Sequence, residues 1–494
     1  MTRLPGRGPL PAVVRGARLP GISWPRLRRA WLPALAVLLP LAAACAGPAR
    51  SESVTLRFWA LGREGEVVQE LMPEFERSHP GIRVLVQQIP IIAAHEKLLT
   101  AFVGRTTPDL AQIGNTWIPE LATIGALSPL DDRLGRSRAL APDQFFAGVW
   151  DTNVIGGALY GVPWYVDTRL LFYRTDLLAA AGYPAPPRSW SGWRHALERI
   201  QRGAPPGRHA VLLPIDEPEQ PIILGLQLGA PLLKDGRRGD FEEPRFAAAF
   251  DFYTGLYRDG LAPIAGNAEI GNVHQQFADG DFVFYPTGPW NLGEFRRRLP
   301  PALAERWATT AWPAPDGAEP PGVSLAGGSS LSIFRAARHP AAAWQLVEYL
   351  SQPAQQLRFY RLCGDLPAHR DAWEDPALAT DPRARAFREQ LQHVRAAPKI
   401  PEWEQIAKQV AYHAEVVVRR RLPPAGARAE LAALDRDVDR ILEKRRWMLS
   451  RTHGGRGAPA TPPLPAPATP LAPAVPPAAP APPTPPTPPN GARR

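Results

Sequence analysis

Cysteine is nearly absent from this chain of 494 residues, which contains only Cys45 and Cys363. If Cys45 is modified, as argued below, Cys363 has no partner for a disulfide within the chain. In the tract Leu362-Cys363-Gly364 we expect the thiol to be a buried, small apolar group rather than a reactive one. Ten histidines are scattered along the chain with no pair at metal-ligand spacing, so the sequence predicts no metal site.

The sequence also lacks the short motifs that carry much of enzyme chemistry. It has no Gly-rich loop followed by Lys-Ser or Lys-Thr, and so no phosphate-binding loop of an ATPase. It has no Gly-x-Ser-x-Gly tract that would present a serine nucleophile. The pair Asp131-Asp132 could serve glycoside hydrolysis, but adjacent acids in a turn are far more often a solvated cap or loop. We therefore expect no enzyme activity and no cofactor.

Basic residues outnumber acidic ones by ten, and this excess is confined to the two ends of the chain. Residues 1–44 contain seven arginines and no acid, and the segment from Arg451 contains four arginines and no acid. Without these eleven arginines, 46 basic side chains stand against 47 acidic ones. The body of the protein is therefore close to neutral, which removes the main electrostatic support for nucleic-acid binding.

The N-terminal segment has the layout of a secretory signal. Arg26, Arg28 and Arg29 precede fifteen apolar or small residues that run from Ala30 to Ala44. This stretch is too short to span a bilayer stably, and small residues close it. Its last four residues, Leu-Ala-Ala-Ala, stand directly before Cys45. This tract resembles a bacterial lipobox, in which the cysteine thiol receives a diacylglycerol before cleavage.

We therefore expect residues 1–44 to be a lipoprotein signal peptide and residues 45–53 a linker. The mature chain would be exported and anchored through Cys45 to a bacterial membrane, at its periplasmic or outer face. An ordinary signal, with Cys45 a chance residue, is the alternative. Residues 27–32 loosely resemble a twin-arginine export motif, whose signals often have long starts. A misassigned start codon explains the long start equally well, and both explanations stay open.

The C-terminal segment changes abruptly in composition at Arg451. Sixteen of the last 44 residues are proline, mixed with alanine and threonine. Such a segment cannot bury a core and favours polyproline II conformations. We expect residues 448–494 to be a disordered tail, which is either a spacer, an arm that contacts the envelope, or a neutral appendage.

Residues 54–114 alternate between strand and helix patterns. Residues 54–60 and 82–86 have the apolar patterns of strands, and residues 66–78 carry a helical apolar stripe between them. A second helix is expected over 93–103 and a third strand over 110–114. This succession implies right-handed crossovers and a parallel sheet of the α/β class. Later helices are expected at 189–202, 243–258, 341–351, 383–396 and 430–447.

Aromatic, glycine and proline residues cluster in loops between these elements. Their order and spacing resemble the family 1 extracellular solute-binding proteins, the maltose-binding-protein-like receptors of sugar ABC importers. The resemblance covers nearly all of residues 54–447. It is carried by the tracts Leu56–Trp59, Pro108–Leu110, Gly125–Asp132, Leu159–Asp167, Pro187–Trp193, Gly288–Trp290, Gly327-Gly328, Trp344–Leu350 and Pro401–Trp403.

This resemblance implies a periplasmic-binding-protein-like fold of type II, with two α/β lobes and the ligand in the cleft between them. By analogy with the family, the chain crosses between the lobes just after Trp164, near residues 312–322 and near Leu350. Lobe one would comprise residues 54–165 plus 316–350, and lobe two residues 166–315 plus 351–447. The partner would be the permease of an ABC transporter, whose ATPase is a separate protein. We expect the receptor to be a monomer.

The resemblance also assigns ligand-binding roles to aromatic residues. Trp290 matches the family position whose ring stacks on a sugar, and Trp403 matches a late aromatic ligand position. Trp164, Tyr165 and Asp167 lie at the expected first crossing. There an acid can accept hydrogen bonds from sugar hydroxyls, although Asp167 could equally fix the hinge.

Loops that follow the expected strands supply further candidates. Asn115 and Trp117 follow the strand that ends at Gly114, and Arg63 and Glu64 follow the first strand. Parallel sheets place ligands outside the carboxyl ends of their strands. The charged side chains of Arg63 and Glu64 could also be ordinary solvated groups of a loop.

A sugar offers flat apolar faces edged with hydroxyl groups, which stacking aromatics and a few polar side chains suit well. Gly327 and Gly328 would let the backbone approach such a ligand, or would form an ordinary turn. We therefore expect a lipid-anchored receptor that closes on a carbohydrate and delivers it to an ABC importer. A receptor for a glycerol phosphate ester, polyamine or peptide is one alternative, with Arg63 and Arg169 as candidate phosphate ligands. A secreted carbohydrate-active enzyme and a structural lipoprotein are the others.

Overall fold

The structure, a computed structural model, describes residues 53–452 and divides the chain into two units. The first unit ends at Leu442 and the second begins at Glu443, with the single described helix α20 (Glu443–Thr452). The expected signal peptide, the lipidation candidate Cys45 and the tail from residue 453 lie outside the described residues. In the described range, no helix has both the length and the apolar character needed to cross a membrane.

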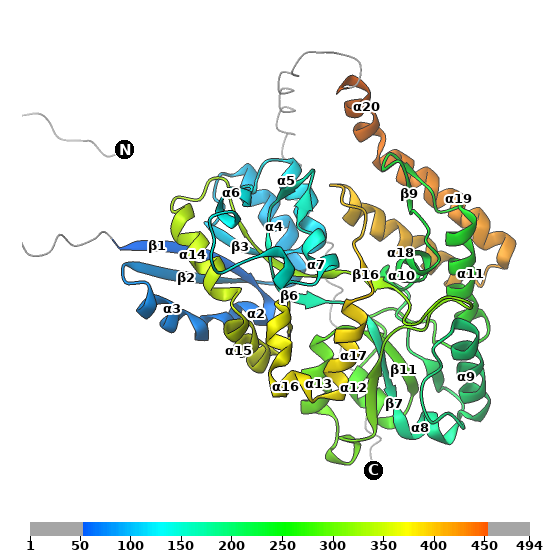
Figure 1. The fold of residues 1–494 in the computed structure, drawn as a ribbon. Helices are drawn as coiled ribbons and strands as arrows, with labels where there is room; N and C mark the ends of the chain where they lie inside the picture. The colour runs from blue at the N-terminus through cyan, green and yellow to red at the C-terminus, as the bar shows by residue number, and fades with distance from the viewer. Residues whose placement is uncertain (1–52, 453–494) are drawn as a thin grey trace, which may run out of the picture. The chain divides into compact units, whose positions relative to one another are not determined.

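The first sheet begins with the expected alternation of strand and helix (Figure 1). β1 (Val54–Leu61) pairs in parallel with β2 (Ile82–Ile89) and with β3 (Leu110–Gly114), and α4 (Ile91–Val103) connects β2 to β3. Later strands complete the order β15-β6-β14-β3-β1-β2, in which β14 runs antiparallel to both of its neighbours. These later strands are β6 (Val162–Asp167), β14 (Gly327–Ile333) and β15 (Leu366–Pro367).

The rest of this first lobe consists of short helices and one small hairpin. They are α2 (Gly62–Val67), η1 (Val68–Leu71), α3 (Met72–Ser78), η2 (Asn115–Trp117), α5 (Ile118–Thr123), α6 (Asp131–Leu134), η3 (Pro142–Gln144), α7 (Ala147–Asp151), β4 (Val154–Ile155), β5 (Ala158–Leu159), α14 (Pro340–Leu350), α15 (Pro353–Cys363) and η5 (Arg370–Glu374). Cys363 is buried in this lobe, as expected, and Trp59 is buried there too.

The second lobe is built on a four-stranded sheet in the order β12-β7-β11-β8. β7 (Leu170–Arg174) runs antiparallel to β11 (Phe282–Thr287) and to β12 (Trp307–Thr310), and β8 (His209–Val211) runs parallel to β11. Around it lie α8 (Thr175–Ala180), α9 (Trp190–Gly203), α10 (Glu219–Gln227), β9 (Leu233–Lys234), β10 (Arg238–Gly239), α11 (Pro244–Arg258), α12 (Val273–Asp279), α13 (Trp290–Arg298), η4 (Pro301–Leu303), α16 (Pro376–Ala379), α17 (Pro382–Leu391), α18 (Trp403–Arg419) and α19 (Pro424–Ile441).

An apolar face of α18 closes the core of the second lobe. Trp403, Ile406, Val410, Ala414 and Val417 recur every three or four positions and are all buried. This spacing places them on one side of the helix. α11 and α19 pack against α18 (Figure 1), and all three helices contribute to the same core.

The chain crosses between the two sheets through short links. β6 ends at Asp167 in the first sheet and β7 begins at Leu170 in the second, so residues 168–169 form the first link. The return link runs from Thr310 to β14 and includes β13 (Ser324–Leu325). The two links lie next to each other, because Thr168 bonds to the Leu325 carbonyl and Ser324 bonds to the Arg169 carbonyl.

The third crossing falls later than expected. β15 pairs with β6, with Leu366 opposite Val166, so this part of the chain is still in the first sheet. The return to the second lobe therefore follows Pro367 instead of lying near Leu350. The expected tail also begins too early, because α20 continues past residue 448 to Thr452.

Two expected helices have different ends in the structure. The helix expected over 383–396 stops at Leu391, because residues 394–395 form the strand β16 (Val394–Arg395), which pairs in parallel with β13. The single amphipathic stretch expected over 430–447 is two helices, with the break at Leu442 between α19 and α20. In both places the apolar pattern continues past the end of the helix, so periodicity alone could not locate the boundary.

Candidate ligand-binding site

A pocket of about 220 Å³ lies at the first crossing between the lobes. Six segments line it: the end of β1, the start of α4, the end of β3 with η2, the end of β6 with the link to β7, the start of α10, and the strand β14 with the residues before it. Several predicted site residues that are far apart in the sequence meet here. They are Asn115, Trp117, Tyr165, Asp167, Gly327 and Gly328.

The end of β3 supplies the first polar group. A turn of 3-10 helix, η2, follows Gly114 and carries Asn115 and Trp117 to the carboxyl end of the parallel strands, where such sheets place ligands. Asn115 is 4% exposed, and its Oδ1 accepts a hydrogen bond of 2.9 Å from the Ser330 hydroxyl. Its Nδ2 has no hydrogen-bond partner within the described part of the chain. Asn115 is therefore held in place while one donor stays unused.

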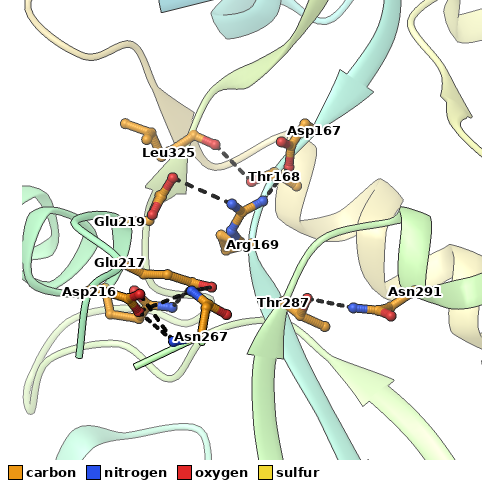
Figure 2. A network of polar contacts seen from close by, with 11 residues as sticks. Asp167, Thr168, Arg169, Asp216, Glu217, Glu219, Asn267, Thr287, Asn291 and Leu325 are labelled. Atoms are coloured by element: carbon orange, nitrogen blue, oxygen red, sulfur yellow. Dashed lines mark hydrogen bonds and ion pairs between the residues drawn. The ribbon is translucent and has the colours of Figure 1, made fainter. Parts of the chain in front are cut away.

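Arg169 is the centre of the charged network shown in Figure 2. Its Nη1 donates to Asp167 Oδ1 over 2.9 Å, and its Nη2 donates to Glu219 Oε1 over 3.4 Å. Burial raises the pKa of Asp167, and the adjacent guanidinium offsets part of this rise. Burial would lower the pKa of Arg169, but the carboxylates of Asp167, Glu219 and Glu217 outweigh it and raise that pKa. Arg169 is therefore fully charged and locally neutralised.

Hydrogen bonds from side chains tie this network to the return link. The Thr168 hydroxyl donates to the Leu325 carbonyl over 2.9 Å, and the Ser324 hydroxyl donates to the Arg169 carbonyl over 2.7 Å. The first of these bonds is drawn in Figure 2. Each of the two links between the sheets is thus held by a hydrogen bond to the backbone of the other. These bonds fix the backbone from which the Arg169 side chain extends.

Tyr165 connects the pocket to helix α2, which follows β1 directly, so that Glu64 lies in a helix and not in the expected loop. Its hydroxyl donates to Glu64 Oε1 over 3.3 Å and accepts from Gln112 Nε2 and Ser329 Oγ, each over 3.0 Å. Burial, together with the charges of Glu64 and Asp365, raises the pKa of Tyr165 well above 10. Burial also raises the pKa of Glu64. Tyr165 is therefore a neutral hydrogen-bonding group at ordinary pH.

Gly327 and Gly328 line the pocket for a reason that the sequence did not reveal. Both belong to β14, which pairs closely with β6. A Cβ on Gly327 would lie 2.9 Å from the Asp167 carbonyl oxygen, and a Cβ on Gly328 would overlap that of Tyr165. Gly328 also has φ +127°, a conformation that side chains disfavour. These glycines therefore let two strands approach each other; they are not in a turn.

Trp290 lies beside the pocket network and is 38% exposed. It is the first residue of α13, and the Arg169 guanidinium lies over its ring, 4.5 Å from the ring centre. Trp290 does not itself line the pocket, but it is linked through Arg169 to residues that do.

Four other predicted residues do not line the pocket, although one of them, Glu64, accepts a hydrogen bond from Tyr165, which does. Trp164 is fully buried, and its ring centre lies 4.3 Å from the ring centre of Phe359. Trp403 is 2% exposed and lies in the core of the second lobe. Neither tryptophan is therefore in a position to contact a ligand in the pocket. Arg63 is exposed and donates to the Leu362 carbonyl over 3.4 Å.

The sequence does not single out Glu219 or Thr168, and it offers Arg169 only as a candidate phosphate ligand. The run of acids at residues 216–219, directly before α10, was the one signal that could have indicated Glu219. Thr168 and Arg169 stand next to the predicted Asp167, but nothing in the sequence indicates which way their side chains point.

Comparison with known proteins agrees with this geometry. The family of bacterial extracellular solute-binding proteins matches residues 59–357. An uncharacterized lipoprotein in the oleD 5' region of Streptomyces antibioticus is 30% identical over 401 residues, which cover 77% of this chain and 86% of that protein.

Solved structures give the same result. The sugar-binding protein MalE from the phytopathogen Xanthomonas citri is 46% identical, with a TM-score of 0.77 over 81% of this chain and 100% of that one. A solute-binding protein of an ABC transporter from Thermotoga lettingae, bound to α-D-tagatose, is 25% identical, with a TM-score of 0.67 over 79% of this chain and 100% of that one. The chain therefore has the two-lobed α/β fold of periplasmic binding proteins and belongs to the bacterial extracellular solute-binding protein family, whose members bind solutes and are not enzymes.

Proposed function

We propose that the protein is a lipid-anchored receptor outside the cytoplasm that binds a sugar at the first crossing and delivers it to the permease of an ABC importer. Asp167 and Asn115 would bond to sugar hydroxyls, and Trp290, Trp117 and Tyr165 would contact the flat faces of the rings. The 46% identity to a structure named as a sugar-binding protein supports the ligand class.

The charge balance of the pocket is the observation that carries this choice. Arg169 is the one cationic side chain among the described residues that line the pocket, and both Asp167 and Glu219 bind it. A phosphate ester would need two or more convergent cations that are free to bind it. Arg63, the other candidate phosphate ligand, does not line the pocket. A neutral ligand rich in hydroxyl groups fits this site better than an anionic one.

A cationic solute such as a polyamine is the second candidate. Glu217 and Glu219 lie close to the pocket, and burial raises the pKa of Glu217. A bound cation would favour the ionised form of these carboxylates. The excess of acids over free bases is the observation that favours this alternative.

Transport follows from the position of the pocket at a crossing between lobes. A ligand that touches both lobes binds best when they are closed, so it shifts the protein toward the closed form. We propose that the closed monomer docks on a membrane permease, and that a diacylglycerol on Cys45 keeps it at the membrane. The Streptomyces relative named as a lipoprotein supports the anchor.

A thermal-shift screen tests the ligand class. The purified protein would be mixed with D-tagatose, maltose, maltotriose, sn-glycerol 3-phosphate and spermidine. A ligand at about 100 times its Kd stabilises the fold by ~2.7 kcal/mol, which is easily seen. We expect a sugar to stabilise the wild type and to have little effect on Asp167→Asn. Asp132→Asn, an exposed acid away from the pocket, is the matched control and should respond as the wild type does. A shift with spermidine or the phosphate ester alone would overturn the sugar assignment.

A further inference from the structure

We propose that Arg169 is a positioning residue of the binding site, which holds the Trp290 indole where a ligand can stack on it. The proposal rests on the proposed function, because it assumes that Trp290 meets a ligand. It goes further by assigning the orientation of that ring to a specific charged side chain on the crossing between the lobes.

The guanidinium of Arg169 is itself fixed before it meets Trp290. Asp167 holds it from the first lobe at 2.9 Å, and Glu219 holds it from the second at 3.4 Å. Its side chain is 14% exposed, and its own carbonyl accepts the Ser324 hydroxyl. Two carboxylates and a bound backbone leave the planar group little freedom to rotate. Arg169 is therefore a rigid support, unlike the solvated arginines on the surface.

The ring of Trp290 has contacts on two sides. The Arg169 guanidinium lies over it at 4.5 Å, within the range of a cation–π contact. On another side the ring lies so close to Gly288 that a Cβ there would overlap its six-membered part. Only the hydrogen of glycine leaves room for this placement. The orientation of Trp290 is thus set by Gly288 and Arg169 together, while 38% of the residue stays exposed for a ligand.

Lysine could not replace arginine in this role. The guanidinium is planar, stacks on aromatic faces and donates to two carboxylates at once, whereas an ammonium is a compact charge on a flexible stem. Arg169→Lys therefore keeps the charge of the network and removes the stacking. If Arg169 were only a structural ion pair, this conservative change would leave Trp290 where it is.

Fluorine NMR of the full chain labelled with 5-fluorotryptophan tests the proposal without any ligand. The Trp290 resonance is assigned as the one that disappears in Trp290→Phe. We expect this resonance to move by more than its linewidth in Arg169→Lys and in Gly288→Ala, two changes that disturb the ring from different sides. The resonances of the other tryptophans should keep their positions.

Arg383→Lys is the matched control, because the Arg383 guanidinium lies 4.0 Å from the ring centre of Trp307, away from the pocket. It should move the Trp307 resonance, assigned with Trp307→Phe, and leave Trp290 in place. A Trp290 resonance that stays within its linewidth in Arg169→Lys would overturn the proposal. Movement of most resonances in that variant would also overturn it, because Arg169 would then act on the fold in general.

Titration calorimetry with D-tagatose, maltose and maltotriose measures the consequence for binding. For any of these sugars that binds the wild type, we expect Arg169→Lys to bind it about 5- to 30-fold more weakly, the range that corresponds to the loss of a partly buried cation–π contact. Arg383→Lys should bind as the wild type does, and equal binding by Arg169→Lys would overturn the proposal. If none of the three sugars binds, the proposed sugar function is what fails, while the NMR result still decides the role of Arg169.

Discussion

Removing the charge of one buried carboxylate should stabilise the protein at neutral pH and have little effect in acid. Asp365, which follows α15, is 6% exposed. Burial raises its pKa to about 7, and the charges of Glu64 and Asp167 add to this rise. The Cys363 thiol and the charge of Arg63 oppose it but are outweighed. The folded state therefore disfavours the ionised form of Asp365.

The sign of the effect follows from proton linkage. Between the ordinary pKa of 3.8 and the folded value of about 7, the folded state binds more protons than the unfolded state. Stability therefore falls as the pH rises through this window. At about 1.4 kcal/mol per unit, the loss reaches ~4 kcal/mol near neutral pH. The first structural unit has an unfolding entropy of about 2.1 cal/mol/K per residue, so a loss of ~4 kcal/mol lowers its Tm by ~5 °C.

Thermal unfolding of the wild type and Asp365→Asn, followed by circular dichroism from about pH 4.5 to about pH 8.5, measures this difference. Asp365→Asn should gain little at the acid end and the full ~5 °C at neutral pH. Asp132→Asn, an exposed acid, is the control and should show a small difference that does not change with pH. A difference for Asp365→Asn that is also independent of pH would refute the reasoning, because Asp365 would then titrate like a solvated acid.

Four further substitutions test the packing and pairing of individual side chains, and chemical denaturation measures each of them. Trp403→Ala should lower the free energy of unfolding by about 3–5 kcal/mol because its ring is buried, whereas Trp290→Ala should change it by less than ~1 kcal/mol. Equal losses of unfolding free energy in Trp403→Ala and Trp290→Ala would contradict the burial of the one ring and the exposure of the other. Gly328→Ala should cost about 1–3 kcal/mol, because the methyl group would overlap the Tyr165 carbonyl oxygen. His413→Ala should cost about 1–3 kcal/mol, since its ring bonds to Glu430 and Asp437 of α19, and its loss removes this partner from Glu430 while Asp437 keeps Arg440; an unchanged midpoint would show that this bridge adds no stability.

The fold class could be predicted because the local patterns agree with one another. Residues 54–114 alternate between strand and helix, and the structure confirms the parallel pairing of the first three strands. The third crossing could not be placed in this way. β15 is only two residues long, and it joins the first sheet because Leu366 and Pro367 pair with β6. A pairing so short leaves no periodic signal, so only the folded chain shows where this strand belongs.

The candidate site was predictable in its location but not in its contacts. Asn115 and Asp167 follow or end strands, and the position of a strand end can be read from the sequence. Trp290 and Trp403 follow similar Pro-containing turns, yet one is exposed beside the pocket and the other is buried in a core. What separates them is the surroundings of each ring. A core formed by distant helices takes up Trp403, and this is not encoded near the residue.

The size of a hollow does not identify the binding site in this protein. Two hollows elsewhere, of about 510 and 600 Å³, are larger than the pocket of about 220 Å³ at the crossing. The larger of these two is lined by residues between 226 and 236, by Val394–Ile400 and by Gly148 and Asp151 of α7, and the other by α11, α19 and Glu242. Of these three hollows in the described residues, only the pocket at the crossing is lined by strand ends of the first sheet together with the link to β7 and the start of α10.

At that crossing, polar groups from both lobes and from the link between them lie together. Asp167 belongs to a strand of the first sheet, Glu219 to a helix of the second lobe, and Arg169 to the link that joins the two sheets. A ligand held there is therefore sensed by both lobes at once, which a receptor that closes on its ligand requires. A ligand bound in a hollow within one lobe would bind the open and closed forms equally, and it would shift nothing.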